Sequence, residues 1–304
     1  MKDRPSVLNW RKDPLYALGV VFLVTLVLLA VFGPTVRNTF IRPKDQPNFA
    51  AVYDPVGVPH QPPFGHYILG TDEQGRDVFS RLAAGARVSL TVGIVVEIIA
   101  LTVGVLVGVL GVYAPKWVSM ILMRFTDGMF AFPDILLAVL IIGTLPPEYV
   151  ATWPMARFLP SILVKLLPVI VALSITSWPA IARLVKGQVA TLKDREFVVG
   201  ARASGASTFY LVTRHILPQL TGILLAVSMI DIAGTILAES TLSFLGIGVQ
   251  PPEASWGSMI NAARQDMNSH PVALVWPCVI LSLTVFALNF VGDGLRAAFD
   301  PKSK

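Results

Sequence analysis

The residues of this chain that could bind an ion or a polar solute are carboxylates within long apolar runs. Glu97, Asp127, Asp231 and Glu239 are four of them, and Asp134 is a fifth. A carboxylate inside a membrane is costly unless it faces protein or water, so such residues often mark the path of a solute or a proton. They equally serve to fix helix packing when they pair with polar neighbours. Both interpretations stay open, and packing is the commoner outcome.

Motifs for enzyme chemistry do not occur in the sequence. It contains no G-x-x-x-x-G-K-[ST] loop for nucleotide phosphates, no H-E-x-x-H zinc motif and no complete G-x-S-x-G elbow. The four histidines are scattered, and the one cysteine, Cys278, lies within an apolar run, so no metal-ligand cluster is expected. We therefore expect a chain without catalytic residues, metal or cofactor of its own.

The composition indicates which elements must position the carboxylates. Hydrophobic residues make up 54% of the 304 residues and charged residues 14%, below the roughly 25% typical of soluble domains. Several apolar runs approach the ~20 residues that span a bilayer. We predict an all-α polytopic membrane protein with six transmembrane helices. Their expected ranges are 15–33, 88–113, 118–144, 161–182, 220–244 and 272–292.

Six spans place both termini on one side of the membrane, and the basic residues indicate which side. About fourteen Lys and Arg lie in the tails 1–14 and 296–304, the turn 113–116 and the insert 183–219, against about eight in the other loops. The positive-inside rule therefore predicts cytoplasmic termini. Because the net charge of +5 reflects this orientation and no basic-aromatic cluster occurs, no nucleic-acid partner is expected.

The segment 34–87 is predicted to be an external loop that ends in an interfacial helix. Thr71 and Gln74 have the spacing of a capping box. Val78 and Leu82 belong to an apolar face, from which the nearby arginines point away, as in a helix lying on a membrane surface. A re-entrant piece packed in the core fits the same pattern equally well.

Two spans carry local signals. Gly104 and Gly108 have the spacing that lets two membrane helices approach closely. In the third span, Pro133 should bend the helix because proline lacks an N–H. Arg124 and Asp127, three residues apart, are expected to form an ion pair on one face of that helix.

The insert 183–219 is polar and basic, and it has the pattern of two short helices joined at a glycine. The first helix is predicted over 193–204, with Asp194 as its N-cap. Helical spacing places three apolar residues of this helix on one face. They are Phe197, Val198 and Ala201.

The second short helix of the insert is expected after Gly205, which can adopt the positive φ that ends a helix. Ser207 can cap this helix, and Phe209 belongs to its apolar face. Pro218 fits the first turn of the helix that follows. An ordinary solvated loop is the alternative, although loops of this length are more often structured or functional.

The insert resembles the cytoplasmic coupling loop of ABC importer permeases. Ala201, Gly205 and Leu217-Pro218 match the second alanine, the glycine and the Leu-Pro of that loop. Three positions depart from it: Val199, Gly200 and His215. The departures resemble the branch of the family that imports dipeptides, oligopeptides and nickel complexes.

Other parts of the chain resemble the same branch, in the order in which the family carries them. They are the stretches 70–77, 242–246 and 291–296, followed by Asp300-Pro301. The likeness implies a type I ABC importer permease fold with a core over 88–295. It also implies dipeptides or oligopeptides as substrates, with nickel complexes or glutathione as alternatives. A stand-alone secondary transporter or channel that uses the intramembrane carboxylates remains open.

The resemblance implies partners and site residues in the inner membrane. Besides the lipid bilayer, the partners are a second permease in a heterodimer, two cytoplasmic ATPases that bind ATP and magnesium, and an external substrate-binding protein. The residues implied for coupling to the ATPases are Asp194, Glu196, Phe197, Val198, Ala201, Arg202, Gly205, Ser207, Phe209 and Pro218. Independently of the resemblance, their position within apolar spans makes four carboxylates the candidates for the translocation path: Glu97, Asp127, Asp231 and Glu239.

Overall fold

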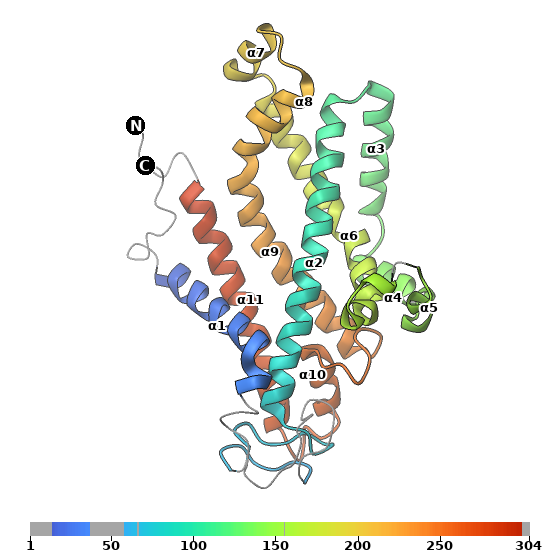
Figure 1. Ribbon diagram of the computed structural model, residues 1–304, viewed down its shortest axis with the longest axis vertical. Helices are drawn as coiled ribbons and strands as arrows, with labels where there is room; N and C mark the ends of the chain where they lie inside the picture. Colours follow the sequence, from blue (N-terminus) through green and yellow to red (C-terminus); the bar gives the residue numbers. More distant parts are fainter. Residues whose placement is uncertain (1–13, 37–57, 66, 155, 300–304) are drawn as a thin grey trace.

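The computed structural model describes residues 14–36, 58–65, 67–154 and 156–299. Nearly all of the predicted N-terminal tail, the loop residues 37–57 and the last five residues of the chain lie outside this part. Every secondary-structure element in the described part of the chain is a helix. Helices α2, α6 and α9 run along the long axis of the molecule (Figure 1). The α-helices are α1 (Pro14–Val36), α2 (Val78–Tyr113), α3 (Lys116–Met129), α4 (Asp134–Thr144), α5 (Pro147–Ala151), α6 (Ser161–Leu192), α7 (Glu196–Ala203), α8 (Thr208–Leu211), α9 (Leu217–Phe244), α10 (Trp256–Arg264) and α11 (Val272–Phe299).

Five elements of the described part are long and apolar enough to cross a membrane. They are α1, α2, α6, the continuous segment Thr208–Phe244 and α11. The third predicted span forms two helices, α3 and α4, which are bent by 93° across a short break and together make a sixth apolar segment. Pro133 directly precedes α4, where its missing N–H and its clash with the preceding residue interrupt the helix. The all-α membrane fold is confirmed, and the expected bend is a complete break.

The close approach predicted from the glycines joins α2 to α6. A Cβ added to Gly104 would lie 2.7 Å from the Cβ of Ile181, and one added to Gly108 would lie 2.7 Å from the Cβ of Val185. A real side chain therefore does not fit at either glycine. The absence of a side chain allows the two backbones to pack directly against each other.

The predicted interfacial helix is instead the first part of α2, which continues into the second span without a break. Val78 and Leu82 are 1% and 6% exposed. They belong to a core cluster with residues of α1, α9 and α10, and the Trp256 indole N–H donates to the carbonyl of Leu82 at 3.3 Å. Of the two placements left open by the sequence, the surface position is wrong and packing in the core is correct, because other helices cover the apolar face.

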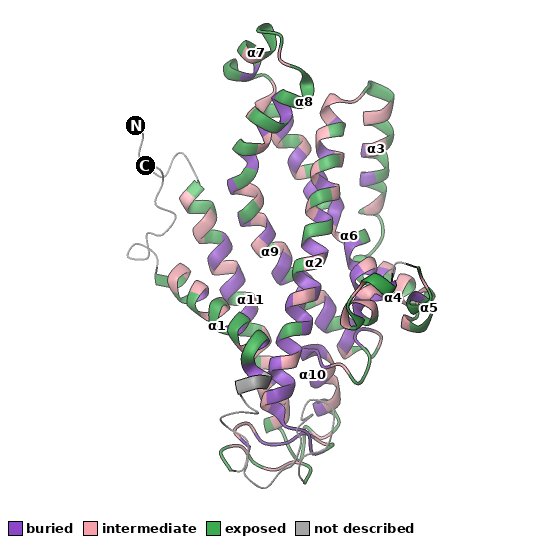
Figure 2. Ribbon diagram, in the orientation of Figure 1, coloured by how far each residue is buried: buried purple, intermediate pink, exposed green. Residues whose placement is uncertain are grey.

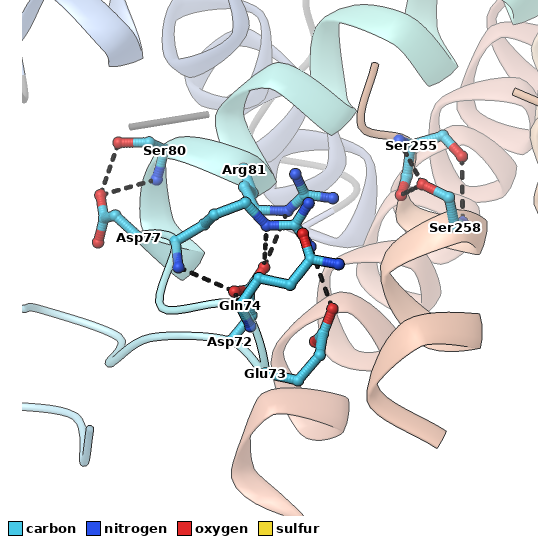
Figure 3. Close-up of polar contacts among 9 residues, drawn as sticks. Asp72, Glu73, Gln74, Asp77, Ser80, Arg81, Ser255 and Ser258 are labelled. Carbon is cyan, nitrogen blue, oxygen red and sulfur yellow. Dashed lines mark hydrogen bonds and ion pairs between the residues drawn. The ribbon is translucent and has the colours of Figure 1, made fainter. Parts of the chain in front are cut away.

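Asp77, and not Thr71, caps the start of α2 (Figure 3). The Asp77 Oδ2 accepts hydrogen bonds from the backbone N–H of Ser80 at 3.1 Å and from its hydroxyl at 2.6 Å. The Thr71 hydroxyl accepts from the Gln61 N–H at 2.8 Å and donates to the Val58 carbonyl at 2.7 Å. Thr71 therefore ties together two parts of the preceding loop.

A buried ion network fixes the loop that leads into α2 (Figure 3). The Asp72 Oδ2 accepts from the Arg76 Nε at 2.7 Å and lies 3.4 Å from the Arg81 Nε. Its Oδ1 accepts from the backbone N–H groups of Gln74 and Arg76 at 3.0 Å and 2.9 Å. Glu73 adds one bond from the Arg76 Nη2 at 3.1 Å. The carboxylate of Asp72 thus holds both the loop backbone and the first turns of α2.

Candidate functional site

The insert between α6 and α9 projects from one end of the bundle as α7 and α8, here called the helix pair (Figure 1). Gly205 joins the two helices with φ +87°, as the sequence predicted. Its N–H donates to the Arg202 carbonyl at 3.0 Å, and the Ala206 N–H donates to the Ala201 carbonyl at 3.1 Å. These bonds satisfy the last carbonyls of α7 and fix the direction in which the chain leaves it.

The second helix of the pair continues into the membrane. Ser207 caps α8 as predicted, since its hydroxyl oxygen accepts from the Tyr210 N–H at 3.3 Å. One π-helical turn, Val212–Ile216, connects α8 to α9, and Pro218 lies in the first turn of α9. The predicted second helix and the fifth span therefore form one continuous helical segment.

The predicted N-cap Asp194 lies outside α7. α6 extends to Leu192, and the Arg195 N–H donates to the Leu192 carbonyl at 3.1 Å, so Asp194 belongs to the turn that ends α6. Arg195 occupies the N-cap position without a side-chain hydrogen bond. Glu196 follows in the first turn, where a negative charge is favourable for the helix dipole.

The apolar faces of the helix pair are divided between the protein interior and the surface. Val198 is fully buried in a core cluster that it shares with residues of α2, α6 and α9, and Ala201 packs against this cluster. In contrast, Phe197 is 44% exposed and Phe209 is 78% exposed, and Arg202 is also at the surface. Much of the pair is therefore exposed (Figure 2), and it presents aromatic side chains there.

An open hollow of about 620 Å³ lies beside the bend at Gly205. Its lining residues are Ala201, Ser204, Gly205, Ala206, Ser207, Tyr210 and His215. The His215 ring contacts Tyr210 and Phe197, with ring centroids 5.6 Å and 6.4 Å apart. Tyr210 lines this hollow and Phe197 lies next to it through its contact with His215, so the surface is concave, a shape suited to receiving part of another protein.

A second cavity, of about 390 Å³, lies where the break between α3 and α4 meets α6 and α9. Both charged residues in its lining are acidic, so we call it the Asp134–Asp231 cavity. The other lining residues are Met129, Phe130, Ile135, Leu173, Thr176, Ser177, Pro179, Ala180, Ile230, Gly234, Thr235, Ala238 and Leu242. The cavity is mainly apolar and has a few polar groups that converge on it, as is usual for ligand sites.

The carboxylates predicted for the translocation path differ in their surroundings. Asp231 lines the Asp134–Asp231 cavity, whereas Glu97 and Glu239 are 4% and 0% exposed inside the subunit. The Glu97 Oε1 accepts from the Ser228 hydroxyl at 2.6 Å, which joins α2 to α9. Glu97 and Glu239 therefore make hydrogen bonds between helices inside the subunit, and their place on the translocation path stays a prediction.

Asp127 forms its ion pair with a different partner from the one expected. The Arg183 Nη2 lies 2.8 Å from the Asp127 Oδ1, so the pairing with Arg124 within α3 is wrong. The Arg183 guanidinium also lies over the Phe130 ring, 4.0 Å from its centroid. Arg183 of α6 makes two contacts at once, one with Asp127 and one with Phe130. An ion pair between Asp127 and Arg124 on the same helix would stabilise that helix by only a few tenths of a kcal/mol, so the contact with Arg183 is favoured.

Sequence reasoning does not identify the hydroxyl groups of the Asp134–Asp231 cavity. Thr176 and Ser177 of α6 and Thr235 of α9 lie in its wall. A serine or threonine within an apolar helix commonly bonds to its own backbone, so the residue type alone carries no signal. Only the tertiary arrangement assembles these groups with the two carboxylates.

Glu239 allows a test of whether a buried carboxylate stabilises the helix packing or takes part in solute transport. Its Oε2 accepts from the Ser89 hydroxyl at 2.9 Å, and its Oε1 accepts from the Ser243 hydroxyl at 2.7 Å. We expect Glu239→Ala to lower the free energy of unfolding by about 1.5 kcal/mol, because buried donors lose their acceptor. Transport per folded complex should remain unchanged. Denaturant unfolding in detergent and a transport assay measure the two quantities.

The control for this variant is Glu148→Ala, which removes an exposed carboxylate from α5. It should leave the unfolding midpoint unchanged. A Glu239→Ala protein with normal stability and slowed transport would instead place Glu239 on the path.

Residues 100–304 match the family described as "Binding-protein-dependent transport system inner membrane component". Curated relatives include the glutathione transport system permease protein GsiD of Escherichia coli O6:K15:H31 (strain 536 / UPEC). The protein of the same name from Shigella boydii serotype 4 (strain Sb227) is another. Each is 36% identical over 296 residues, which cover 97% of this chain and 89% of the relative.

Among solved structures, the fold is similar to that of the MetNI methionine ABC transporter in inward-facing conformations. The CY5 native crystal form matches with a TM-score of 0.55 and 20% identity, over 71% of this chain and 94% of that chain. The CY5 SeMet soak crystal form matches with a TM-score of 0.56 and 19% identity. At this identity, the likeness concerns the fold alone.

Proposed function

Because this chain belongs to the family of binding-protein-dependent transport system inner membrane components, we propose that it forms half of the translocation path of an ATP-driven importer. The other half would come from a second, related permease. As a permease component, the chain is a multi-pass inner-membrane protein, and ATP is hydrolysed by partner subunits. Family membership sets aside the stand-alone secondary transporter and the channel.

The observation that carries the proposal is the projecting helix pair. It extends from the bundle with Phe197 and Phe209 exposed, and Tyr210 and His215 line the hollow at its bend, so it offers an apolar contact outside the membrane-crossing helices. We assign this surface to one of two cytoplasmic ATPases, with both termini on the same side. Charged Asp194, Glu196 and Arg202 would surround the contact. An external substrate-binding protein would deliver the solute at the opposite end, near α10.

The proposed solute is a short peptide, with glutathione included because it is itself a tripeptide. Two observations support this choice. The relatives named above carry a glutathione transport name, and they match nearly the whole chain. The Asp134–Asp231 cavity, at about 390 Å³, is also within the usual range for small-molecule sites.

Charge at the exposed tip of the helix pair should disrupt the assembly. In Phe209→Asp, an aromatic contact would be replaced by a carboxylate in an apolar interface. Removing an aromatic anchor costs 2 kcal/mol or more in many interfaces, so the amount of ATPase that co-purifies with the permease should fall at least about tenfold. Uptake of labelled glutathione or dialanine into vesicles should fall with it.

Phe158→Asp is the matched control, because Phe158 is 80% exposed and lies at a site remote from the helix pair. It should co-purify and transport like the wild type. Equal loss in both variants would mean that any exposed charge harms the complex. Normal ATPase recovery with Phe209→Asp would contradict the docking assignment.

A further inference from the structure

Two of the three hydroxyl groups in the Asp134–Asp231 cavity are arranged as acceptors. The Ser177 hydroxyl donates to the Leu173 carbonyl at 2.7 Å, and the Thr176 hydroxyl donates to the same carbonyl at 3.0 Å. Because each hydroxyl has a single hydrogen, these two oxygens have only lone pairs left for a ligand. They therefore match a group that donates hydrogen bonds and accepts none.

The charge of the cavity favours the same kind of group. Among the described residues, Asp134 and Asp231 have no ion-pair partner, whereas nearby Asp127 is paired with Arg183. Asp134 is exposed and Asp231 is half-buried, and neither is neutralised by a positive charge of the described residues, so a cation within the cavity would be stabilised by both. An anionic group would meet only negative charge there.

The interrupted helix is a third and independent sign of a ligand site. Residues 130–133 leave the helical conformation within an apolar segment, and Met129 and Asp134 on either side of this break both line the cavity. Irregular backbone at membrane depth is tolerated where it lines a cavity, and interrupted helices commonly form solute sites in transporters. The backbone is thus irregular at the place where the unpaired carboxylates gather.

We propose that the Asp134–Asp231 cavity binds the primary ammonium group of the transported peptide during its passage. The proposal rests on the importer function given above and deepens it. Both carboxylates accept hydrogen bonds from the ammonium group, which has three donors and no acceptor. The apolar walls contact the rest of the solute. Dipeptides and glutathione share this ammonium group, whereas an N-acetylated peptide has lost it.

The test measures binding to the complex of both permeases and the ATPases, purified without the binding protein, so that only the permease selects the ligand. Dialanine is titrated by ligand-observed NMR, with N-acetyl-dialanine, glutathione and nickel chloride as competitors. Glutathione should displace dialanine. N-acetyl-dialanine should compete at least about tenfold more weakly, because a charged hydrogen bond is lost.

Asp134→Asn and Asp231→Asn should each raise the Kd for dialanine at least about tenfold and leave the unfolding midpoint of the complex unchanged. The control is Asp293→Asn, the same change at an exposed residue of α11 outside the cavity lining, which should bind normally. Equal competition by the N-acetylated peptide would overturn the ammonium site. Displacement by nickel that depends on both aspartates would overturn it in favour of a metal site.

Failure of this proposal can be distinguished from failure of the proposed function. If no ATPase co-purifies, or if wild-type vesicles take up neither dialanine nor glutathione, the importer or its substrate class is wrong. If the wild-type complex assembles and transports, and both asparagine variants bind and transport like it, only the ammonium site is wrong. The uptake comparison uses one binding protein throughout, so its own selectivity cancels between variants.

Discussion

Asp72→Ala is expected to lower the free energy of unfolding by roughly 3–5 kcal/mol, the cost of breaking a buried ion network from one side. The side chains of Asp72, Arg76 and Arg81 are only 6–10% exposed. Removing the carboxylate leaves two guanidinium groups without their shared partner. It also removes the acceptor for two backbone N–H groups of the loop. Denaturant unfolding of the purified complex in detergent measures the loss.

Glu73→Ala is the matched control for this effect. Glu73 contributes one bond to Arg76, and its side chain is 22% exposed, so its removal should cost about 1 kcal/mol or less. Asp72→Asn keeps one oxygen acceptor and should fall between the two alanine variants. Equal destabilisation by Asp72→Ala and Glu73→Ala would show that the central carboxylate is not what holds this network.

Gly108→Leu is expected to destabilise the subunit by at least about 3 kcal/mol, at the upper end of overpacking effects. A Cβ at this position would already lie 2.7 Å from the Val185 Cβ and 2.8 Å from the Ala182 carbonyl oxygen. Neither neighbour can move without displacing α6. We therefore expect α2 and α6 to separate, with loss of folded protein from detergent extracts and a lower unfolding midpoint.

Gly187→Leu provides the comparison, since it makes the same change in α6 at a position with no atom within 4 Å of the added Cβ. Leucine has a higher helix propensity than glycine, so this variant should be as stable as the wild type or slightly more stable. If both leucine variants lost the same stability, the close α2–α6 contact would not be the cause.

The spans and the helix pair could be predicted because their signals are local. Apolar runs give the membrane helices, and the glycine spacing at 104 and 108 predicts the close contact with a second helix. Gly205 and Ser207 indicate where the chain bends and where the next helix begins. Each of these features depends on a few consecutive residues, and the structure agrees with them.

The errors concern contacts between distant parts of the chain. Asp194 fits the sequence preference for an N-cap, but it lies in the turn between the end of α6 and the start of α7, where Arg195 takes the N-cap position. Arg183 is remote in sequence from Asp127, so the local candidate Arg124 was the only partner that spacing offered. The helix face that contains Val78 would be apolar whether it faced lipid or protein. Its burial is decided by packing against other helices, which the local sequence does not reveal.

The uninterrupted segment Thr208–Phe244 has a mechanical consequence. At about 1.5 Å per residue it is a shaft of roughly 55 Å, and Asp231 lies some 35 Å from its exposed tip. Apart from the π-helical turn Val212–Ile216 near its tip, this segment is α-helical, so it can carry a sideways displacement to the wall where the solute would sit. We therefore expect the tip and that wall to move together. A protein that displaces the tip would then change the lining of the solute cavity in the same movement.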